Sequence, residues 1–297
     1  MSIPLHLALE VDTPSTATDI AALERAVAAA ERAAVAFVTI DDHPGAPAIE
    51  AGVRASYLAR RTARIGLAPT LHVATTEPFH RATQLASLDH ATLGRAAWVV
   101  GAARGAEALA TVGREPLGPE AVRRETADVI DVARRLWDSW EDDAVIRDVA
   151  TGRFLDRERV HHVGFEGATF SVIGPLITPR PPQGQVVVIG SDALGVTGRL
   201  DIALVGGDTV DDIGRRAVRA RRHGAALAFA ELTGLDDLER RLERLAGVVD
   251  GVRLHLPDLE LVDQIPPGLA LAAAGATLRE TLGLPRPANR YALARTA

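Results

Sequence analysis

Eight short apolar runs recur along the chain, and a segment of helical character follows most of them. Runs such as AVAFVTI and VVVIGS are apolar at almost every position, which is typical of strands covered on both faces. Buried strands that alternate with helices predict an α/β protein, a (β/α)8 TIM barrel of parallel strands. The runs occupy residues 5–11, 34–40, 63–71, 96–101, 186–191, 202–207, 226–232 and 251–256.

An open, doubly wound sheet is the alternative arrangement of the same elements. When that fold binds dinucleotides it carries G-x-G-x-x-G after its first strand, and LHLALEVDTPSTA has no such pattern. We therefore favour the barrel, in which functional groups lie at the carboxyl ends of the strands. The positions at or just after the carboxyl ends of the runs are Asp42, His43, His72, Gly101, Ser191, Gly207, Glu231 and His255.

Local signals indicate where several of the intervening helices begin. Thr209 and Asp212 resemble a capping box, and Thr233 with Asp236 repeats this spacing before a stripe of leucines. An aspartate before an alanine-rich segment and a proline at the first position of a helix are further start signals. We expect helices to begin at or near Asp19, Glu77, Thr209 and Thr233.

Residues 136–185 interrupt the alternation with a long irregular excursion. Helical spacing stops near Trp140, and four prolines between residues 175 and 182 exclude helix and central strand there. Its several aromatic residues argue against disorder. We expect a packed hairpin and a proline-rich strap, inserted between the fourth and fifth strands, that brace the barrel within a single domain, residues 1–297.

Composition excludes several classes of function. The net charge of −6 argues against a nucleic-acid groove, and the absence of cysteine excludes disulfides and thiolate metal sites. No apolar run approaches the length of a membrane span, and MSIPLHLALEVD does not resemble a signal peptide. We expect a cytoplasmic protein with no metal site and no membrane contact.

Four segments in the same order resemble one enzyme family. They are ASLDHATLGRAAW, LWDSWEDDAVIRD with TGRFLDRERVHHVGFEG, PRPPQGQ, and TLRETLGLPRPANRY. They are similar to the bacterial-luciferase-like flavin monooxygenases, in the branch of nitrilotriacetate monooxygenase, pristinamycin synthase and dibenzothiophene-sulfone monooxygenase. The resemblance extends from about residue 37 to residue 291, in a chain shorter than typical members.

The resemblance implies a barrel enzyme, usually a homodimer, that uses reduced FMN supplied by a separate flavin reductase. It implies oxidation of a small organic substrate with molecular oxygen, in which the flavin carries the chemistry and the protein positions it. Nothing in the sequence selects FMN over a deazaflavin.

The chain departs from the family at positions expected near the flavin. Ala102 stands where the family has a threonine, and Arg123 lies where a tyrosine is expected near the phosphate. Asp192 replaces a serine that binds phosphate, and a carboxylate beside a phosphate is repulsive by about 1 kcal/mol or more. Gly190 and Ser191 keep the character of a small anion-binding turn, for which a tight turn without a ligand is the alternative interpretation.

The candidate catalytic residues are His43 and His72, because each follows a strand and an imidazole can exchange protons near neutral pH. Asp42 is a candidate flavin contact, with a turn or helix cap as the alternative. Arg199 is a candidate phosphate ligand, with a surface salt bridge as the alternative. The candidate cofactor-binding residues are Asp42, Ala102, Gly190, Ser191 and Arg199.

Two functions follow from these observations. The first is an FMN-dependent monooxygenase that acts on a small organic molecule. The second is a non-catalytic paralogue with weakened flavin binding, which serves as a binding or structural partner. The three departures at Ala102, Arg123 and Asp192 favour the second function, and the family resemblance favours the first.

Overall fold

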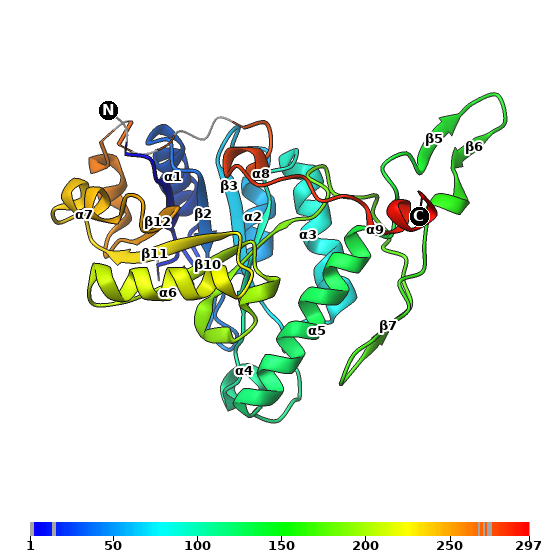
Figure 1. Ribbon diagram of the computed structural model, residues 1–297, viewed down its shortest axis with the longest axis horizontal. Coiled ribbons are helices and arrows are strands. Elements are labelled where there is room, and N and C mark those ends of the chain that lie inside the picture. The colour runs from blue at the N-terminus through cyan, green and yellow to red at the C-terminus, as the bar shows by residue number, and fades with distance from the viewer. Residues whose placement is uncertain (1–2, 14–15, 267, 270, 272–274, 297) are drawn as a thin grey trace.

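Eight parallel strands close into a barrel in the order β1-β12-β11-β10-β9-β4-β3-β2 (Figure 1). The computed structural model describes residues 3–13, 16–266, 268–269, 271 and 275–296. Because β1 pairs with both β12 and β2, the sheet has no edge in the barrel, which confirms the predicted TIM barrel and excludes the open sheet. The strands are β1 (His6–Glu10), β2 (Phe37–Ile40), β3 (Gly66–His72), β4 (Ala97–Gly101), β9 (Val187–Ser191), β10 (Ile202–Val205), β11 (Leu227–Thr233) and β12 (Gly251–His255).

Helices surround the barrel, and local capping explains where several of them begin. The predicted starts at Asp19, Glu77 and Thr209 are confirmed, because each side chain accepts hydrogen bonds from backbone N–H groups of the first helical turn. The helices are α1 (Ile20–Arg32), α2 (Ala51–Leu58), α3 (Pro78–Thr92), α4 (Ala106–Ala110), α5 (Pro119–Trp137), α6 (Val210–Arg222), α7 (Leu238–Leu245), α8 (Leu278–Thr281) and α9 (Arg290–Thr296). Short 3-10 turns are η1 (Arg157–Arg159), η2 (Asp192–Leu194), η3 (Thr197–Arg199) and η4 (Leu259–Gln264).

One predicted helix start is wrong. Thr233 ends β11, and α7 begins five residues later, after Asp237, which has a left-handed backbone conformation and no side-chain cap. The tight turn after β11 therefore uses the residues that resembled a capping box. Trp140 lies beyond the end of α5, and its indole N–H donates to the Leu176 carbonyl in the strap.

The barrel has an apolar interior that is separate from the core between strands and helices. Inward-facing side chains such as Ala8, Phe37 and Phe229 fill its lower part, and Leu278 and Leu282 of the α8 region close it from below. Side chains alternate across a strand, so residues two positions after these inward-facing ones also point into the barrel. The apolar packing leaves the polar groups at the carboxyl ends of the strands.

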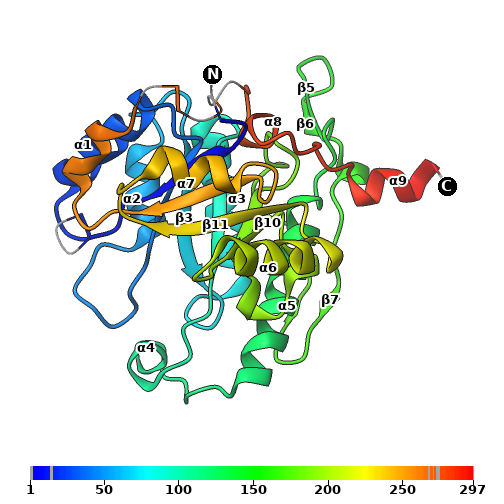
Figure 2. The ribbon, with the colours of Figure 1, turned by 60° about the vertical axis from the view of Figure 1, so that its left-hand side comes forward.

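The excursion between β4 and β9 contains two hairpins with different surroundings. β7 (Phe165–Glu166) and β8 (Ser171–Val172) pack against the core beside α5, as predicted. β5 (Val145–Asp148) and β6 (Arg153–Leu155) form a second hairpin, which was not predicted and which projects from the barrel as an arm (Figures 1 and 2). Val149 and Phe154 on this arm are 93% and 61% exposed.

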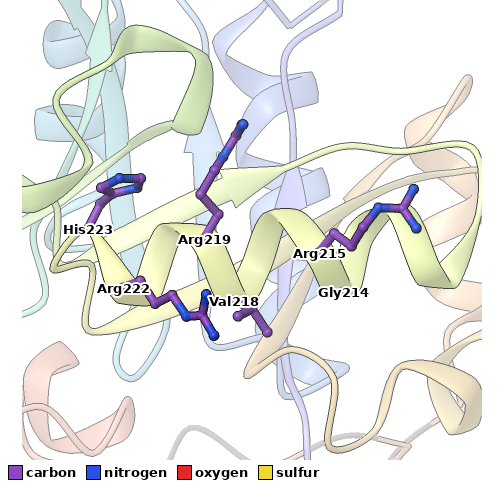
Figure 3. A pocket seen from close by; sticks show the side chains of 6 residues that line it. All are labelled: Gly214, Arg215, Val218, Arg219, Arg222 and His223. Atoms are coloured by element: carbon purple, nitrogen blue, oxygen red, sulfur yellow. The ribbon is translucent and has the colours of Figure 1, made fainter.

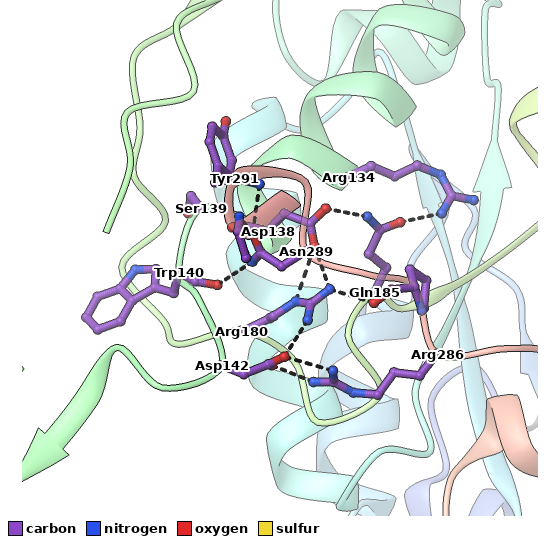
Figure 4. Close-up of polar contacts among 12 residues, drawn as sticks. Arg134, Asp138, Ser139, Trp140, Asp142, Arg180, Gln185, Arg286, Asn289 and Tyr291 are labelled. Carbon is purple, nitrogen blue, oxygen red and sulfur yellow. Dashed lines mark hydrogen bonds and ion pairs between the residues drawn. The ribbon is translucent and has the colours of Figure 1, made fainter. Parts of the chain in front are cut away.

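The sequence segments that resemble the flavin monooxygenases meet at the amino-terminal end of the barrel (Figure 4). Arg180 of the strap donates to Asp138 at the end of α5, at 3.0 Å, and to Asp142, at 2.8 Å. Asn289 of the tail donates to the carbonyl groups of Asp138 and Trp140. Gln185, just before β9, donates to the second carboxylate oxygen of Asp138 at 2.8 Å. These segments therefore hold the strap and tail to the barrel, at the end opposite to the strand ends where a TIM-barrel site lies.

Candidate functional site

The carboxyl ends of β1, β2, β11 and β12 bring five polar side chains together at the mouth of the barrel. We call these five residues the mouth cluster: Glu10, Thr39, Glu231, Arg253 and His255. Their positions follow from strand register, because Glu10 pairs with Thr39 on one side and with His255 on the other, and Glu231 pairs with Arg253.

Glu10 is the innermost acid of the mouth cluster. One of its oxygens accepts hydrogen bonds from Thr39 Oγ1 at 2.7 Å and from Arg253 Nη1 at 3.3 Å. Its other oxygen accepts from the Asp12 backbone N–H at 3.2 Å. Only 12% of the side chain is exposed, and burial raises the pKa of Glu10 to about 7 even though Arg253 and Thr39 favour the charged form. Glu10 can therefore gain or lose a proton near neutral pH.

Glu231 lies closer to solvent and has the opposite electrostatic character. His255 Nε2 lies 3.3 Å from Glu231 Oε1, and Arg253 Nη2 donates to the same oxygen. The hydrogen bond from His255, together with the charge of Arg253, lowers the pKa of Glu231 to about 2 despite partial burial. One guanidinium group thus bridges an ionised carboxylate and a second carboxyl group that titrates near neutral pH. The buried Nε of Arg253 has no hydrogen-bond partner among the described residues.

A second cluster orients His43, one of the predicted catalytic residues. Its Nε2 lies 2.7 Å from Asp12 Oδ2, and the other oxygen of Asp12 accepts from the fully buried Arg54 at 2.6 Å. Desolvation lowers the pKa of His43, but the hydrogen bond and the charge of Asp12, with help from Asp41 and Asp42, outweigh it and raise the pKa. The ring is half exposed, so it can reach a ligand at the mouth.

His72, the other predicted catalytic residue, is held by backbone groups on both sides. Its Nδ1 accepts from the Ala103 N–H at 3.1 Å, so Nε2 carries the hydrogen and donates to the Asp42 carbonyl at 3.0 Å. A side chain at Gly101 would overlap the imidazole ring. His72 therefore ties the β2–α2 loop to the segment that contains Ala102, and in this arrangement neither ring nitrogen is available as an acid or base.

Asp42 contacts the start of a helix, because its Oδ1 accepts a hydrogen bond from the N–H of Ala51, the first residue of α2, at 3.2 Å. A helix cap was the alternative to its predicted flavin contact. Contact between Asp42 and a flavin stays a prediction, as does contact with Ala102. Gly190 faces away from the barrel interior, since a side chain there would meet Leu194 and Leu200. Ser191 faces the mouth, and its hydroxyl accepts from the Ala193 N–H at 3.2 Å.

Asp192, for which the sequence predicted repulsion of a phosphate, has two arginine neighbours in the structure. Asp192 is buried against α6, where its carboxylate forms an ion pair with Arg216 and lies 3.5 Å from Arg219. Its charge is therefore balanced by the protein. Arg123 instead lies over the turn after β9, against Gly195, which has a left-handed φ of 69°.

Arg199 does not lie at the mouth. It precedes β10, at the opposite end of the strand from the site, and its guanidinium group donates to both oxygens of Asp131 on α5 at 2.9–3.0 Å. Arg199 therefore forms a surface salt bridge, which was the alternative to its predicted role. Its predicted role as a phosphate ligand is not supported.

Sequence reasoning missed Glu10, Arg253, Asp12 and Arg54. The first two carried a usable signal, because each is a charged residue at an inward-facing position of a mostly apolar strand, in LHLALEV and GVRLHL. No local pattern pairs Asp12 with Arg54, which lie 42 residues apart. Within the described part of the chain, no group of three or more histidine, aspartate or glutamate side chains is placed to hold a metal ion.

Two cavities differ in their relation to the mouth. One of about 430 Å³ lies at the carboxyl ends of β10 and β11, and its lining includes Glu231, Thr209, Arg241 and Arg244. The other, of about 590 Å³, lies on the outer face of α6, where the arginine side chains point away from the helix (Figure 3). Only the first adjoins the mouth cluster, through Glu231.

Comparison with known proteins gives a consistent set of relatives. A family model described as luciferase-like monooxygenase matches residues 2–246. The chain is 33% identical over 301 residues to one of the chains of the pristinamycin IIA synthase of Streptomyces pristinaespiralis, a match that covers 99% of both sequences.

Two further relatives match over a shorter length. The chain is 43% identical over 141 residues to N-acetyl-S-(2-succino)cysteine monooxygenase of Bacillus subtilis (strain 168) and 43% identical over 135 residues to nitrilotriacetate monooxygenase component A of Aminobacter aminovorans. These matches cover 47% and 44% of this chain, and they span only 32% and 29% of the two relatives.

Solved structures support the fold. The EDTA monooxygenase of Chelativorans sp. BNC1 superposes with a TM-score of 0.83 at 17% identity, covering 95% of this chain and 99% of that one. A long-chain alkane monooxygenase superposes with a TM-score of 0.81 at 16% identity, covering 95% and 96%. At these identities the likeness bears on the fold alone.

Proposed function

Because the chain belongs to the luciferase-like monooxygenase family, we propose that it is a flavin-dependent monooxygenase that oxidises a small organic substrate with reduced FMN and molecular oxygen. The observation that carries the proposal is the mouth cluster, a set of partly buried ionisable groups at the strand ends where TIM-barrel enzymes bind their ligands. Membership of the family supports the flavin and the reaction type.

The residues around the mouth fit a flavin nucleotide. The phosphate would be held by the turn after β9, where Ser191 offers a hydroxyl group and Arg123 a guanidinium group whose partner, Glu120, is also exposed. The flavin ring would lie toward the mouth cluster, where the unpartnered Nε of Arg253 can donate a hydrogen bond. With Asp192 neutralised by Arg216, the main electrostatic objection to phosphate binding is removed.

When bound, reduced flavin supplies the electrons that activate oxygen, and the protein supplies position, proton transfer and exclusion of water. We propose that His43 is the catalytic acid or base at the rim, and that Asp12 and Arg54 position its ring. His72 is proposed as a positioning residue, because its two backbone hydrogen bonds hold the segment that contains Ala102 next to the β2–α2 loop.

We propose that the substrate enters the cavity between β10, β11 and α6. The lining carries two arginines, Arg241 and Arg244, two acidic side chains, Asp208 and Glu231, and apolar walls from Val210, Ile213 and Leu245. An organic acid suits this lining where its carboxylate pairs with one of the arginines. Two relatives are named for nitrilotriacetate and N-acetyl-S-(2-succino)cysteine, both of which carry several carboxylates, which agrees with this substrate class.

The proposal has three further parts. A separate flavin reductase supplies the reduced FMN, the chain is a single domain that assembles as a homodimer, and the protein is cytoplasmic. The exposed apolar side chains that gather on the arm support the homodimer, because apolar surface of this kind marks interaction sites. Among the described residues, no helix has the length and apolar character needed to cross a membrane.

The decisive experiment is a titration of the purified protein with oxidised and with reduced FMN, followed by flavin fluorescence and absorbance. We expect both forms to bind, and Arg123→Ala to weaken binding about tenfold through loss of a charged phosphate contact worth about 1.5 kcal/mol. The matched control is Arg124→Ala, which removes the neighbouring exposed arginine of α5. No binding of either form would refute the proposal, and equal losses in the two variants would refute the role of Arg123.

A further inference from the structure

The mouth cluster contains one acidic group more than its guanidinium group can balance. Glu10 and Glu231 both accept hydrogen bonds from Arg253, on different nitrogens, so a single positive charge faces two carboxyl groups. These three groups together carry a net negative charge when both carboxyl groups are ionised and no net charge when one of them holds a proton.

The geometry decides which acid holds that proton. Glu231 also accepts from His255, and its side chain is 30% exposed, so the ionised form is stabilised. Glu10 is 12% exposed and receives its hydrogen bonds deep in the barrel, where an ionised carboxylate is poorly solvated. The proton therefore belongs to Glu10.

The polar and charged neighbours of Glu10 come from the two strands that pair with β1, and from β11 beyond them. Thr39 and Asp41 lie on or next to β2, and Arg253 and His255 lie on β12. Glu231 of β11 acts through Arg253. Two of these neighbours, Asp41 and Glu231, are acidic, so a further negative charge at the mouth would make the ionised form of Glu10 still less favourable.

We propose that Glu10 takes up a proton when reduced flavin binds, so that the mouth cluster becomes neutral beneath the negatively charged reduced ring. This inference rests on the proposed function. The reduced flavin ring carries one more negative charge at neutral pH than the oxidised ring, and the phosphate is the same in both. The two forms of the cofactor should therefore differ in the number of protons that the protein takes up from solvent on binding.

The coupling has a functional consequence. Glu10 holds the acquired proton at the floor of the site while the ligand occupies the mouth, and releases it to solvent when the reduced ring is lost. The affinity for reduced flavin should then fall as the pH rises through the range in which Glu10 titrates, from about 7 upward, and the affinity for oxidised flavin should change less.

The test is isothermal titration calorimetry of the full chain under anaerobic conditions. Each form of FMN is titrated at about pH 7.5 in two buffers with different ionisation enthalpies, and the difference in heat gives the number of protons taken up. A pKa of about 7 that rises by roughly one on binding predicts that reduced FMN brings in about half a proton more than oxidised FMN.

Glu10→Gln should abolish that difference while both forms still bind. Asp89→Asn is the matched control, because Asp89 is also a buried acid with a raised pKa but lies at the other end of the barrel, where it accepts from Gln183. The control should keep the wild-type difference. Should Glu10→Gln fail to fold, Thr39→Val removes one donor to the carboxylate, and the pH of maximal uptake should rise.

The results that overturn the inference are distinct from those that overturn the function. Equal proton uptake for the two FMN forms in the wild-type protein, or an unchanged difference in Glu10→Gln, would refute the role of Glu10 while leaving the monooxygenase proposal intact. Failure of both forms to bind would refute the proposed function and this inference with it.

Discussion

Replacing Glu10 by glutamine is expected to stabilise the protein at alkaline pH and to have little effect at acidic pH. Burial raises the pKa of Glu10 from its ordinary value of 4.5 to about 7, against the opposing effect of Arg253. Between these two values the native protein binds more protons than the unfolded chain, so the free energy of unfolding falls as the pH rises through this window. One pKa unit corresponds to about 1.4 kcal/mol, which makes the loss about 3 kcal/mol above neutral pH.

Urea unfolding, followed by the fluorescence of the buried Trp98 and Trp137, measures this effect at about pH 4 and about pH 8.5. The variant cannot ionise at position 10, so its stability relative to wild type should rise by about 3 kcal/mol between the two conditions. Asp89→Asn provides the comparison, because the pKa of Asp89 rises only from 3.8 to about 6 and its effect should be complete at lower pH. A stability difference between Glu10→Gln and wild type that does not change with pH would refute the reasoning.

Three further outcomes are expected. Asp12→Asn should lower the pKa of His43 toward its ordinary value, because it removes the negative charge that favours the imidazolium. An NMR titration of the ring should show the midpoint moving to lower pH. An unchanged midpoint would contradict the contact between His43 and Asp12. Arg180→Ala should lower the free energy of unfolding by about 3–5 kcal/mol, since it leaves the carboxylate of Asp138 buried without a positive charge beside it. A loss under about 1 kcal/mol in urea unfolding would contradict this role of the strap. Phe154→Ser should weaken a homodimer formed through the arm without changing the circular dichroism of the barrel, and sedimentation of the variant as a dimer of wild-type stability would exclude the arm as the interface.

The strands and most helix starts could be predicted because their causes are local. A run such as VVVIGS needs burial on both faces, and Asp19 caps a helix by contacting backbone atoms two and three residues away. Prediction failed at Thr233 and Asp236, which have the right spacing for a cap. The chain there turns sharply after β11, and the turn takes the residues that the spacing assigned to the helix.

The candidate site was predicted less well, because a charged side chain takes its role from partners far away in the sequence. Asp192 looked repulsive to a phosphate until α6 supplied Arg216, 24 residues later. Arg199 looked available for a ligand until α5 supplied Asp131. His72 follows a strand as a catalytic residue would, yet two backbone groups occupy its ring nitrogens.

The segments that resemble the flavin monooxygenases have a structural role in this chain. Asp138, Arg180 and Asn289 come from three of these segments, and they meet at the amino-terminal end of the barrel. Their spacing along the chain reflects the need to hold the strap and tail in place. A strong family resemblance in such segments therefore indicates ancestry and fold more directly than chemistry.

By itself, the sequence determined the alternation of strands and helices, the closed barrel and the end of the barrel where a site would lie. These depend on hydrophobic periodicity and on backbone geometry, both of which act over a few residues. The tertiary structure alone decided that Glu10, Arg253 and Glu231 form one hydrogen-bonded cluster, because barrel closure places β1 beside β12, and Glu10 and Arg253 lie 243 residues apart in the sequence. Burial then sets the protonation of Glu10, and burial is a property of the folded barrel.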